Sequence, residues 1–117
     1  MEPLTLAEIA ERTDADVVHR GPGFADRPVR AVVATDQMSD ALTCETDGGL
    51  MVTALASPQV LRTADMIGAA GVLFTLGKTL PSDVPAMAGP LGLTVLRTRL
   101  PKFETCAALL GHPGSVP

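Results

Sequence analysis

Polar and charged residues stand at the ends of several apolar stretches that have the composition of buried strands. If these strands are parallel, their carboxyl ends open a crevice at one edge of the sheet, where such folds bind their ligands. Ser57 begins an expected helix with free amides, and Lys78 leaves a neighbouring strand, so both could hold an anion. We therefore expect a small anionic ligand at Thr35, Asp36, Thr53, Ser57, Thr75, Lys78, Arg97 and Arg99.

Several basic residues also have a simpler interpretation, in which they keep the surface soluble or pair with a second subunit: Lys78, Arg97, Arg99 and Lys102. Residues 1–58 contain four Lys or Arg and ten Asp or Glu, a net charge of −6, whereas residues 59–117 contain five and three, a net +2. This division favours a homodimer in which each acidic half faces the partner's basic half. Apolar packing in the dimer would come from Met38, Ala41, Leu42 and the helix 102–110.

Asp36 and Asp40 flank a turn that follows a strand, so their carboxylates could share acid-base work or a divalent cation. The alternative is that they cap helix amides, as acidic residues in such turns commonly do. No third oxygen-rich cluster lies nearby in the sequence, and we favour the capping role. The sequence therefore predicts no metal site.

Nucleophilic and phosphate-loop chemistry are not indicated either. Ser39 and Ser57 begin helices without a histidine that a motif would place beside them. The two histidines, His19 and His112, lie in an expected edge strand and in the tail. The Gly-Lys-Thr at 77–79 lacks the upstream glycine of a nucleotide-binding loop. We therefore predict no enzyme activity and no cofactor.

The composition excludes several classes of partner. With three Phe and no Tyr or Trp, the chain has no aromatic platform for single-stranded nucleic acid, and its net charge of −4 disfavours polyanions. The segment LTLAEIAERTDADVV could open a helix-turn-helix, but no basic recognition helix follows it. No apolar stretch approaches the ~20 residues that span a bilayer. Cys44 and Cys106 lack metal-binding or redox spacing, so we expect reduced thiols and a cytoplasmic protein. From the composition and the missing apolar span, we expect no nucleic acid or membrane partners.

Residues 49–78 contain the elements that must position the candidate site. We expect a strand at Leu50–Ala54, a helix that starts at Ser57-Pro58, and a second strand at Val72–Leu76. Because a connection of this length joins parallel strands, both should lie parallel to a third strand at Leu93–Arg97. The expected core includes Val52, Ala64, Ile67, Leu73 and Phe74.

Details of the connecting helix also follow from the sequence. Gly71 should end it, while Arg62, Thr63 and Asp65 should point to water.

The remaining segments complete the domain. A capping box at Thr5 and Glu8 should begin a helix that ends near Thr13, and strands should follow at 15–20 and 29–35, the second inside the sheet. Further helices are expected through Cys44, from Ser82 to about Gly89, and over 102–110 with Phe103, Cys106, Ala107 and Leu110 buried. We predict a single α/β domain, residues 1–111, with helices packed on a mostly parallel central sheet of four or five strands, and a flexible tail, 112–117.

Four segments of the chain together form a recognisable pattern: LTLAEIAERTDADVV, VVATDQMSDAL, GLMVTALASPQVLRTADMIGAAGVLFT and LTVLRTRLPKFETCAALL. This pattern resembles the DRTGG domain family, which is related to the N-terminal domain of HPr kinase/phosphorylase. The order and spacing are similar to those of the family's short, single-domain members. Ala56-Ser57-Pro58 stands near the family's Asp-Arg position, and Thr75-Leu76-Gly77-Lys78 stands where Thr-Gly-Gly would be expected.

The resemblance implies a non-enzymatic regulatory domain that works as a homodimer and senses a small anionic ligand such as a nucleotide. Similar domains occur beside CBS domains in a regulated pyrophosphatase and ahead of the catalytic part of phosphate acetyltransferases. Two alternatives remain open. One is a protein-interaction module without a ligand that binds a partner protein, and the other is a small acid-base or metal-dependent enzyme that uses Asp36 and Asp40.

Overall fold

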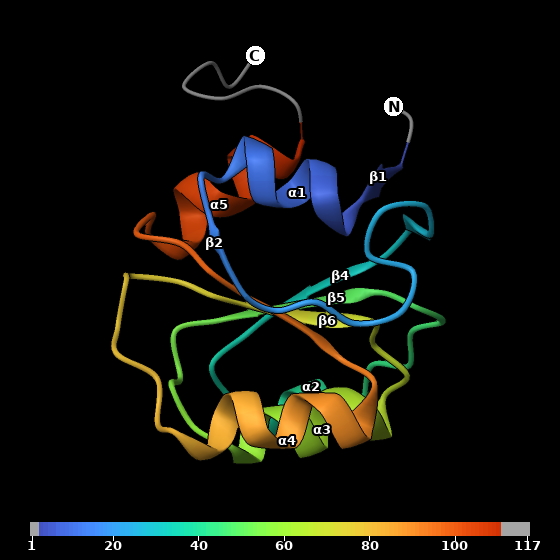
Figure 1. Cartoon of the computed structure of the whole chain (residues 1–117), viewed down its shortest axis with the longest axis vertical. Helices are drawn as coiled ribbons and strands as arrows, with labels where there is room; N and C mark the ends of the chain where they lie inside the picture. Colours follow the sequence, from blue (N-terminus) through green and yellow to red (C-terminus); the bar gives the residue numbers. More distant parts are fainter. Residues whose placement is uncertain (1–2, 111–117) are drawn as a thin grey trace.

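The computed structural model describes residues 3–110, which form a five-stranded sheet between two layers of helices (Figure 1). The strands lie in the order β2-β7-β6-β5-β4. Their bounds are Asp16–His19 for β2, Val32–Ala34 for β4, Leu50–Thr53 for β5, Gly71–Phe74 for β6 and Thr94–Arg97 for β7. The last four are parallel, and β2 runs antiparallel to β7. The predicted α/β fold and the parallel pairing of its three central strands are confirmed.

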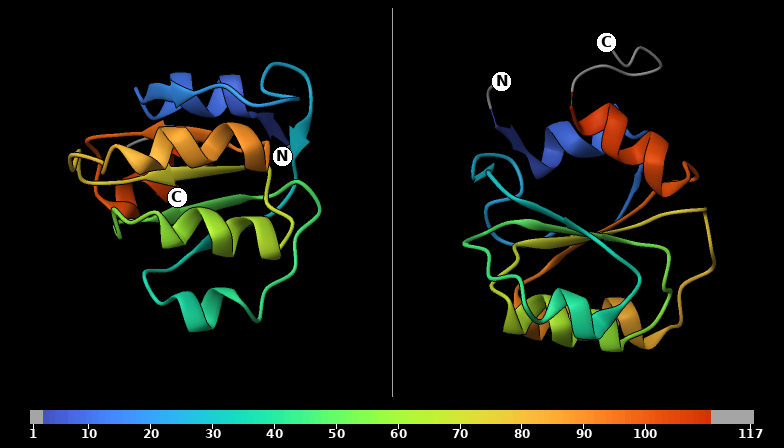
Figure 2. Two further views of the ribbon diagram at one scale, coloured as in Figure 1. Left: turned by 60° about the horizontal axis from the view of Figure 1, so that its bottom comes forward. Right: turned by 180° about the vertical axis from the view of Figure 1, so that it is seen from behind.

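The helices divide between the two faces of the sheet. Helices α1 (Leu6–Arg12) and α5 (Lys102–Leu109) cover one face. Helices α2 (Met38–Ala41), α3 (Gln59–Met66) and α4 (Asp83–Leu91) lie side by side on the other (Figure 2). Two short strands, β1 (Leu4–Thr5) and β3 (Pro28–Val29), pair with each other outside the main sheet. The fold is therefore a three-layer sandwich.

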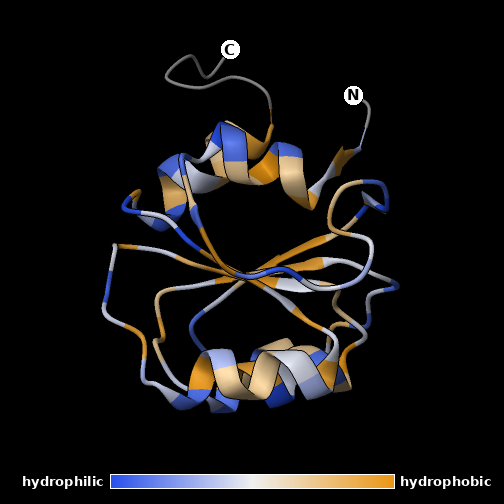
Figure 3. Ribbon diagram, in the orientation of Figure 1, coloured by the Kyte–Doolittle hydropathy of each residue, from blue (hydrophilic) through white to orange (hydrophobic). Residues whose placement is uncertain are grey.

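Strands β5 and β6 are buried at every position because both of their faces are covered. Side chains alternate, so that Met51 and Phe74 enter the cluster under α2–α4, whereas Val52 and Leu73 enter the cluster under α1 and α5. Figure 3 shows the resulting band of apolar residues along the strands. The predicted core residues Val52, Ala64, Ile67, Leu73 and Phe74 are all buried.

Local signals at helix ends were informative for α1 but less so for α3 and α4. The capping box of α1 is present, since the Thr5 hydroxyl accepts from the Glu8 amide and Glu8 accepts from the Thr5 amide. Helix α3 ends at Met66, before a turn in which Gly68 has a φ of +80°, whereas Gly71, the predicted end, begins β6. Thr63 was expected in water but is only 4% exposed, and its hydroxyl is satisfied by donating to the Gln59 carbonyl within the helix.

Helix α4 continues through Pro90 to Leu91, further than expected, and Gly92 ends it with a φ of +66°. Ser82 occupies the position before the helix but its side chain makes no capping hydrogen bond.

The predicted strand 29–35 is wrong in two respects. It is split into β3, which pairs with β1, and β4, which pairs with β5. Because Arg30 and Ala31 separate these pairings, only three residues reach the main sheet, and β4 lies at its edge rather than inside it. Val32 is consequently 46% exposed.

The predicted buried side of the last helix is also wrong. Thr105, Ala108 and Leu109 are buried, whereas Phe103 is 69% and Leu110 57% exposed. Tertiary contacts accompany this rotation: the Leu76 amide donates to the Leu100 carbonyl just before the helix, and Leu109 joins the core cluster that contains Leu6 and Ile9 of α1. The predicted tail, 112–117, lies outside the described residues.

Candidate functional site

The carboxyl ends of β4, β5, β6 and β7 meet at one edge of the sheet, where β2 begins. Their ends are nearly level, since Ala34 pairs with Val52, Thr53 with Phe74, and Phe74 with Arg97. The candidate residues follow these ends or the turns beyond them. The structure divides them into one group after β4 and β5, another after β7, and Thr75 between the two groups.

Asp36 is the centre of the first group because three donors reach its carboxylate. Oδ1 accepts from the Thr53 hydroxyl at 3.0 Å and from the Ala54 amide at 2.8 Å. Oδ2 lies 2.8 Å from Nζ of Lys102. Asp36 thereby joins the loop after β4 to the end of β5 and to the start of α5.

These contacts also determine the protonation of Asp36. The hydrogen bond from Lys102, followed by that from the Ala54 amide, holds the pKa of Asp36 below its ordinary value of 3.8. A carboxylate with a lowered pKa is a poor proton acceptor near neutral pH. Asp40 is exposed and offers its backbone carbonyl to the Thr43 hydroxyl. Within residues 3–110, no group of three or more His, Cys, Asp or Glu could hold a metal ion.

Three other candidate residues are close to Asp36 or to the turn at Thr53 and Ala54, either in the sequence or through a hydrogen bond. Nζ of Lys78 donates to the Ala54 carbonyl at 2.9 Å, so it bonds the residue whose amide bonds Asp36. The Ser57 hydroxyl accepts from the Gln59 amide at 3.3 Å at the start of α3. The Thr35 hydroxyl accepts from the Gln37 amide at 3.0 Å. The hydroxyls of Ser57 and Thr35 therefore order the backbone locally.

Lys102 belongs to this group, although it is not among the ligand-binding residues predicted at the strand ends. Its ammonium is part of the Asp36 arrangement because α5 begins directly after a short segment, 98–101, that crosses the end of β6. One sequence signal could have identified Lys102 as a site residue. It is the first residue of an expected helix and lies shortly after the end of a strand. Its partner, Asp36 in the loop after β4, could not be predicted from that spacing.

The second group consists of Arg97 and Arg99, and both are paired within the chain. Arg97 bonds Asp16 at 3.1 Å and Arg99 lies 3.5 Å from Asp14. These residues line a cavity of about 290 Å³ together with Gly77 and Thr98. Because each arginine already pairs with a carboxylate of its own chain, neither requires a neighbouring subunit as its partner.

The acidic first half and the basic second half are in fact joined inside one chain. The three ion pairs that do so are Arg97–Asp16, Arg99–Asp14 and Lys102–Asp36. The uneven charge distribution therefore gives no separate reason for a dimer.

Thr75 lies at the end of β6 and is fully buried. Its hydroxyl has no hydrogen-bond partner in the described part of the chain. The segment 98–101 crosses this strand end, since the Gly77 amide donates to the Thr98 carbonyl and the Leu76 amide to the Leu100 carbonyl. Thr75 is consequently closed to solvent, and a ligand at the exposed edge would meet Asp36, Lys78 and Lys102 instead.

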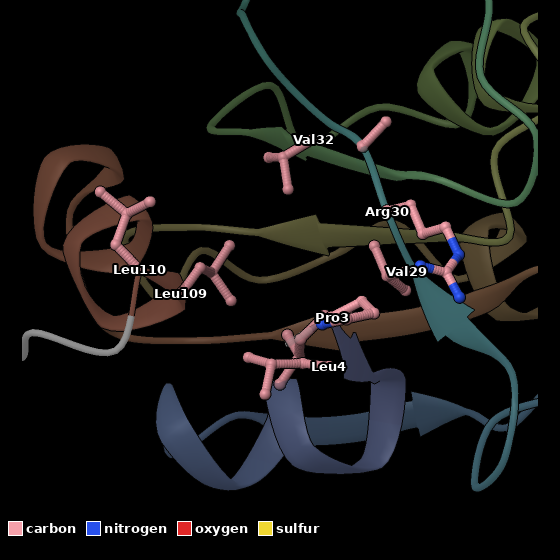
Figure 4. Close-up of a pocket in the computed structure, with 9 residues that line it drawn as sticks. Pro3, Leu4, Val29, Arg30, Val32, Leu109 and Leu110 are labelled. Atoms are coloured by element: carbon pink, nitrogen blue, oxygen red, sulfur yellow. The ribbon is translucent and has the colours of Figure 1, made fainter. Parts of the chain in front are cut away.

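A larger apolar groove of about 350 Å³ lies elsewhere and contains none of the candidate residues. Figure 4 shows its side chains, which come from β1, α1, β3, β4, the end of α5 and the residues next to these strands and this helix. They are Pro3, Leu4, Ile9, Val29, Arg30, Ala31, Val32, Leu109 and Leu110. The groove runs beside the free edge of β4, where Val32 and Leu110 remain substantially exposed.

Comparison with known proteins agrees with this architecture. The structure is similar to that of the CBS and DRTGG domains of the regulatory region of Clostridium perfringens pyrophosphatase, solved with its activator diadenosine tetraphosphate. The TM-score is 0.75 at 15% sequence identity, and the match covers 91% of this chain but 46% of that one, so this chain spans less than half of that structure. A search of curated protein sequences gives no match.

Two further observations complete the description. None of the helices within residues 3–110 has the length and hydropathy needed to cross a membrane. The sequence model of the DRTGG domain matches residues 8–111, nearly the whole chain. The chain therefore belongs to the DRTGG domain family.

Proposed function

We propose that this chain is a non-enzymatic regulatory domain that senses a small anionic ligand, such as a nucleotide, at the carboxyl edge of its sheet. The observation that carries the proposal is the set of donors around the turn at Thr53 and Ala54. An amide, a hydroxyl and two ammonium groups gather around this turn, from the end of β5, the loop after β6 and the first residue of α5. Charge-assisted hydrogen bonds of this kind are the strongest that a protein offers to a phosphate.

The surroundings of this turn favour a nucleotide over an isolated phosphate. Phe103 directly follows Lys102 and is 69% exposed, contrary to the expectation that it is buried. An exposed ring one residue along α5 from Lys102 offers a surface on which a base can stack. The pyrophosphatase regulatory region with a similar fold was solved with a nucleotide activator, which supports the same ligand class.

Regulation fits these residues better than catalysis. Asp36 keeps a low pKa and is bound by three donors, so it is unsuited to the role of general base.

Cys44 and Cys106 are both free thiols, which supports a reducing compartment such as the cytoplasm.

A thermal-shift screen with phosphate, AMP, ADP and ATP tests the proposal. A ligand at about 100 times its dissociation constant should stabilise the wild type by about 2.7 kcal/mol. Lys78→Met and Lys102→Met should lose most of this stabilisation, each compared with its own ligand-free melting curve. Arg62→Met removes an exposed charge on α3, away from the turn, and should respond like the wild type. Stabilisation that survives both lysine changes, or that no compound produces, would contradict the proposal.

A second candidate function is a protein-interaction module, and the apolar groove favours it. The groove borders β4, an edge strand whose outer side offers unpaired backbone groups within the described structure. We propose that a homodimer forms through this region, on the basis of apolar surface rather than of charge. Val32, Leu110 and the groove between them supply that surface.

A further inference from the structure

The Asp36 carboxylate occupies the position that an anion would take at this edge. Three donors converge on it within 3.0 Å: the Thr53 hydroxyl and the Ala54 amide at the end of β5, and the Lys102 ammonium at the start of α5. Such a set of donors is how proteins hold a phosphate or carboxylate ligand. Here the chain itself provides the negative charge.

We propose that Asp36 acts as an internal competitor, and that a phosphate group binds the carboxyl edge by displacing its carboxylate from Thr53, Ala54 and Lys102. This inference rests on the proposed function and adds how that function is regulated. The ligand class is a phosphate monoester or inorganic phosphate, with the base of a nucleotide as an additional contact.

The charges and the donor geometry favour such an exchange. Asp36 has two oxygens, and both are already in use, Oδ1 by Thr53 and Ala54 and Oδ2 by Lys102. A phosphate has three free oxygens and about −1.5 to −2 charges. It can therefore satisfy the same donors and also attract Lys78, which now bonds the neutral Ala54 carbonyl at 2.9 Å.

Exposure makes the exchange feasible. The side chain of Asp36 is 47% exposed and that of Lys102 is 32% exposed, so a ligand can approach from solvent and the carboxylate can turn outward. The neighbouring ion pairs provide a contrast, because Arg97 and Arg99 contact only single carboxylates. An anion at either arginine would break an ion pair without finding an amide and a hydroxyl already in position.

Displacement would also transmit a signal. Asp36 lies between β4 and α2, and its ion pair with Lys102 is a direct connection from this segment to α5 on the opposite face of the sheet. Releasing the carboxylate removes that connection and frees the loop before α2. A change of ligand would thus change the coupling between the two helical layers.

The test compares phosphate affinity in the full chain with and without the competing carboxylate. Inorganic phosphate is titrated into wild type and Asp36→Ala, with the backbone amide resonance of Ala54 as the readout. We expect Asp36→Ala to bind phosphate at least tenfold more tightly than the wild type. Formate, which mimics the missing carboxylate, should raise the melting temperature of Asp36→Ala more than that of the wild type.

Control variants keep the result interpretable. Asp36→Asn retains an oxygen for the Ala54 amide and should fold if Asp36→Ala does not; it should bind phosphate more tightly than the wild type. Adding Lys102→Met to either change should abolish the gain, whereas Asp14→Asn, which removes a carboxylate from the Arg99 pair, should produce none.

The outcomes separate this inference from the proposed function. If the wild type binds nucleotide and the Asp36 variants bind phosphate equally or more weakly, the competition is refuted while ligand sensing stands. If neither the wild type nor the Asp36 variants bind any anion, both are refuted. A gain that persists without Lys102 would also refute the competition at this position.

Discussion

The ammonium of Lys102 lies 2.8 Å from the carboxylate of Asp36, which ties the first residue of α5 to the loop that follows β4. No local pattern indicates this contact, because the two residues belong to elements on either side of the sheet. It brings a cation to the turn at Thr53 and Ala54 and makes Asp36 a structural residue. Its contribution can be measured through the pH dependence of stability.

Asp36→Asn should destabilise the protein near neutral pH but not in acid. Because the folded-state pKa of Asp36 lies below its ordinary 3.8, its charge contributes stability above that value, which is lost as pH falls through the folded pKa. The pair is partly exposed, so we expect a difference of about 1 kcal/mol near pH 7. Urea denaturation of both proteins across the acid range measures it. A difference that stays constant below the ordinary pKa would show that the charge of Asp36 is not responsible.

Leu76→Gly should stabilise the protein. Leu76 has a φ of +67°, a conformation that costs an ordinary residue about 1–2 kcal/mol, and its side chain is 49% exposed. After the entropy cost of glycine, a gain of about 0.5–1 kcal/mol should remain in chemical denaturation. Gly92→Ala is the matched opposite, since Gly92 has a φ of +66° and open space around it, and it should destabilise. If Leu76→Gly destabilises the protein and Gly92→Ala stabilises it, backbone strain does not determine the stability change at either position.

Phe74→Ala should cost about 3–5 kcal/mol, because Phe74 is 1% exposed within the cluster under α2–α4. Phe103→Ala is the control: it removes the same ring from a position that is 69% exposed and should change stability by no more than about 0.5 kcal/mol. Equilibrium unfolding in urea gives both values. Similar losses for the two variants would show that the rotation of α5 is misassigned.

Sedimentation at micromolar concentration tests the proposed homodimer. We expect a species of twice the 12.1 kDa chain mass that changes little with salt, because the ion pairs between the acidic and basic halves lie within one chain. Val32→Lys places a charge on the exposed edge strand and should give the monomer. A 12.1 kDa species for the wild type at every salt concentration would exclude the dimer.

The parts of the fold that local signals determine could be predicted from the sequence. The capping box at Thr5 and Glu8 marks the start of α1, and two short apolar runs around a helix specify β5 and β6 as buried parallel strands. A strand that is covered on both faces is apolar at successive positions, so its sequence marks it as buried whichever elements pack against it. The core was accordingly correct.

The features that failed depend on contacts between distant segments. The rotation of α5 goes with the bond of Leu100 to Leu76 and the burial of Leu109 beside α1, and an apolar pattern that includes Phe103 and Leu110 misrepresents it. Strand β4 is short because β3 pairs with β1 outside the main sheet.

The candidate site was predicted only in outline for the same reason. Strand ends indicate which residues lie along the edge, but not that Arg97 pairs with Asp16 or that Lys102 reaches Asp36. The left-handed backbone at Leu76 and Gly77 gives a physical reason for glycines at the expected Thr-Gly-Gly position.

Titration calorimetry of ADP into the wild type, Lys102→Met and Arg99→Met tests the central claim of ligand sensing most directly. Both changes remove one positive charge, but only Lys102 contacts Asp36, whose carboxylate also accepts from the Ala54 amide. We predict that the wild type and Arg99→Met bind ADP with similar affinity and that Lys102→Met binds at least tenfold more weakly, a loss of about 1.4 kcal/mol. Equal affinity for Lys102→Met and the wild type, or no binding by the wild type, would contradict the account.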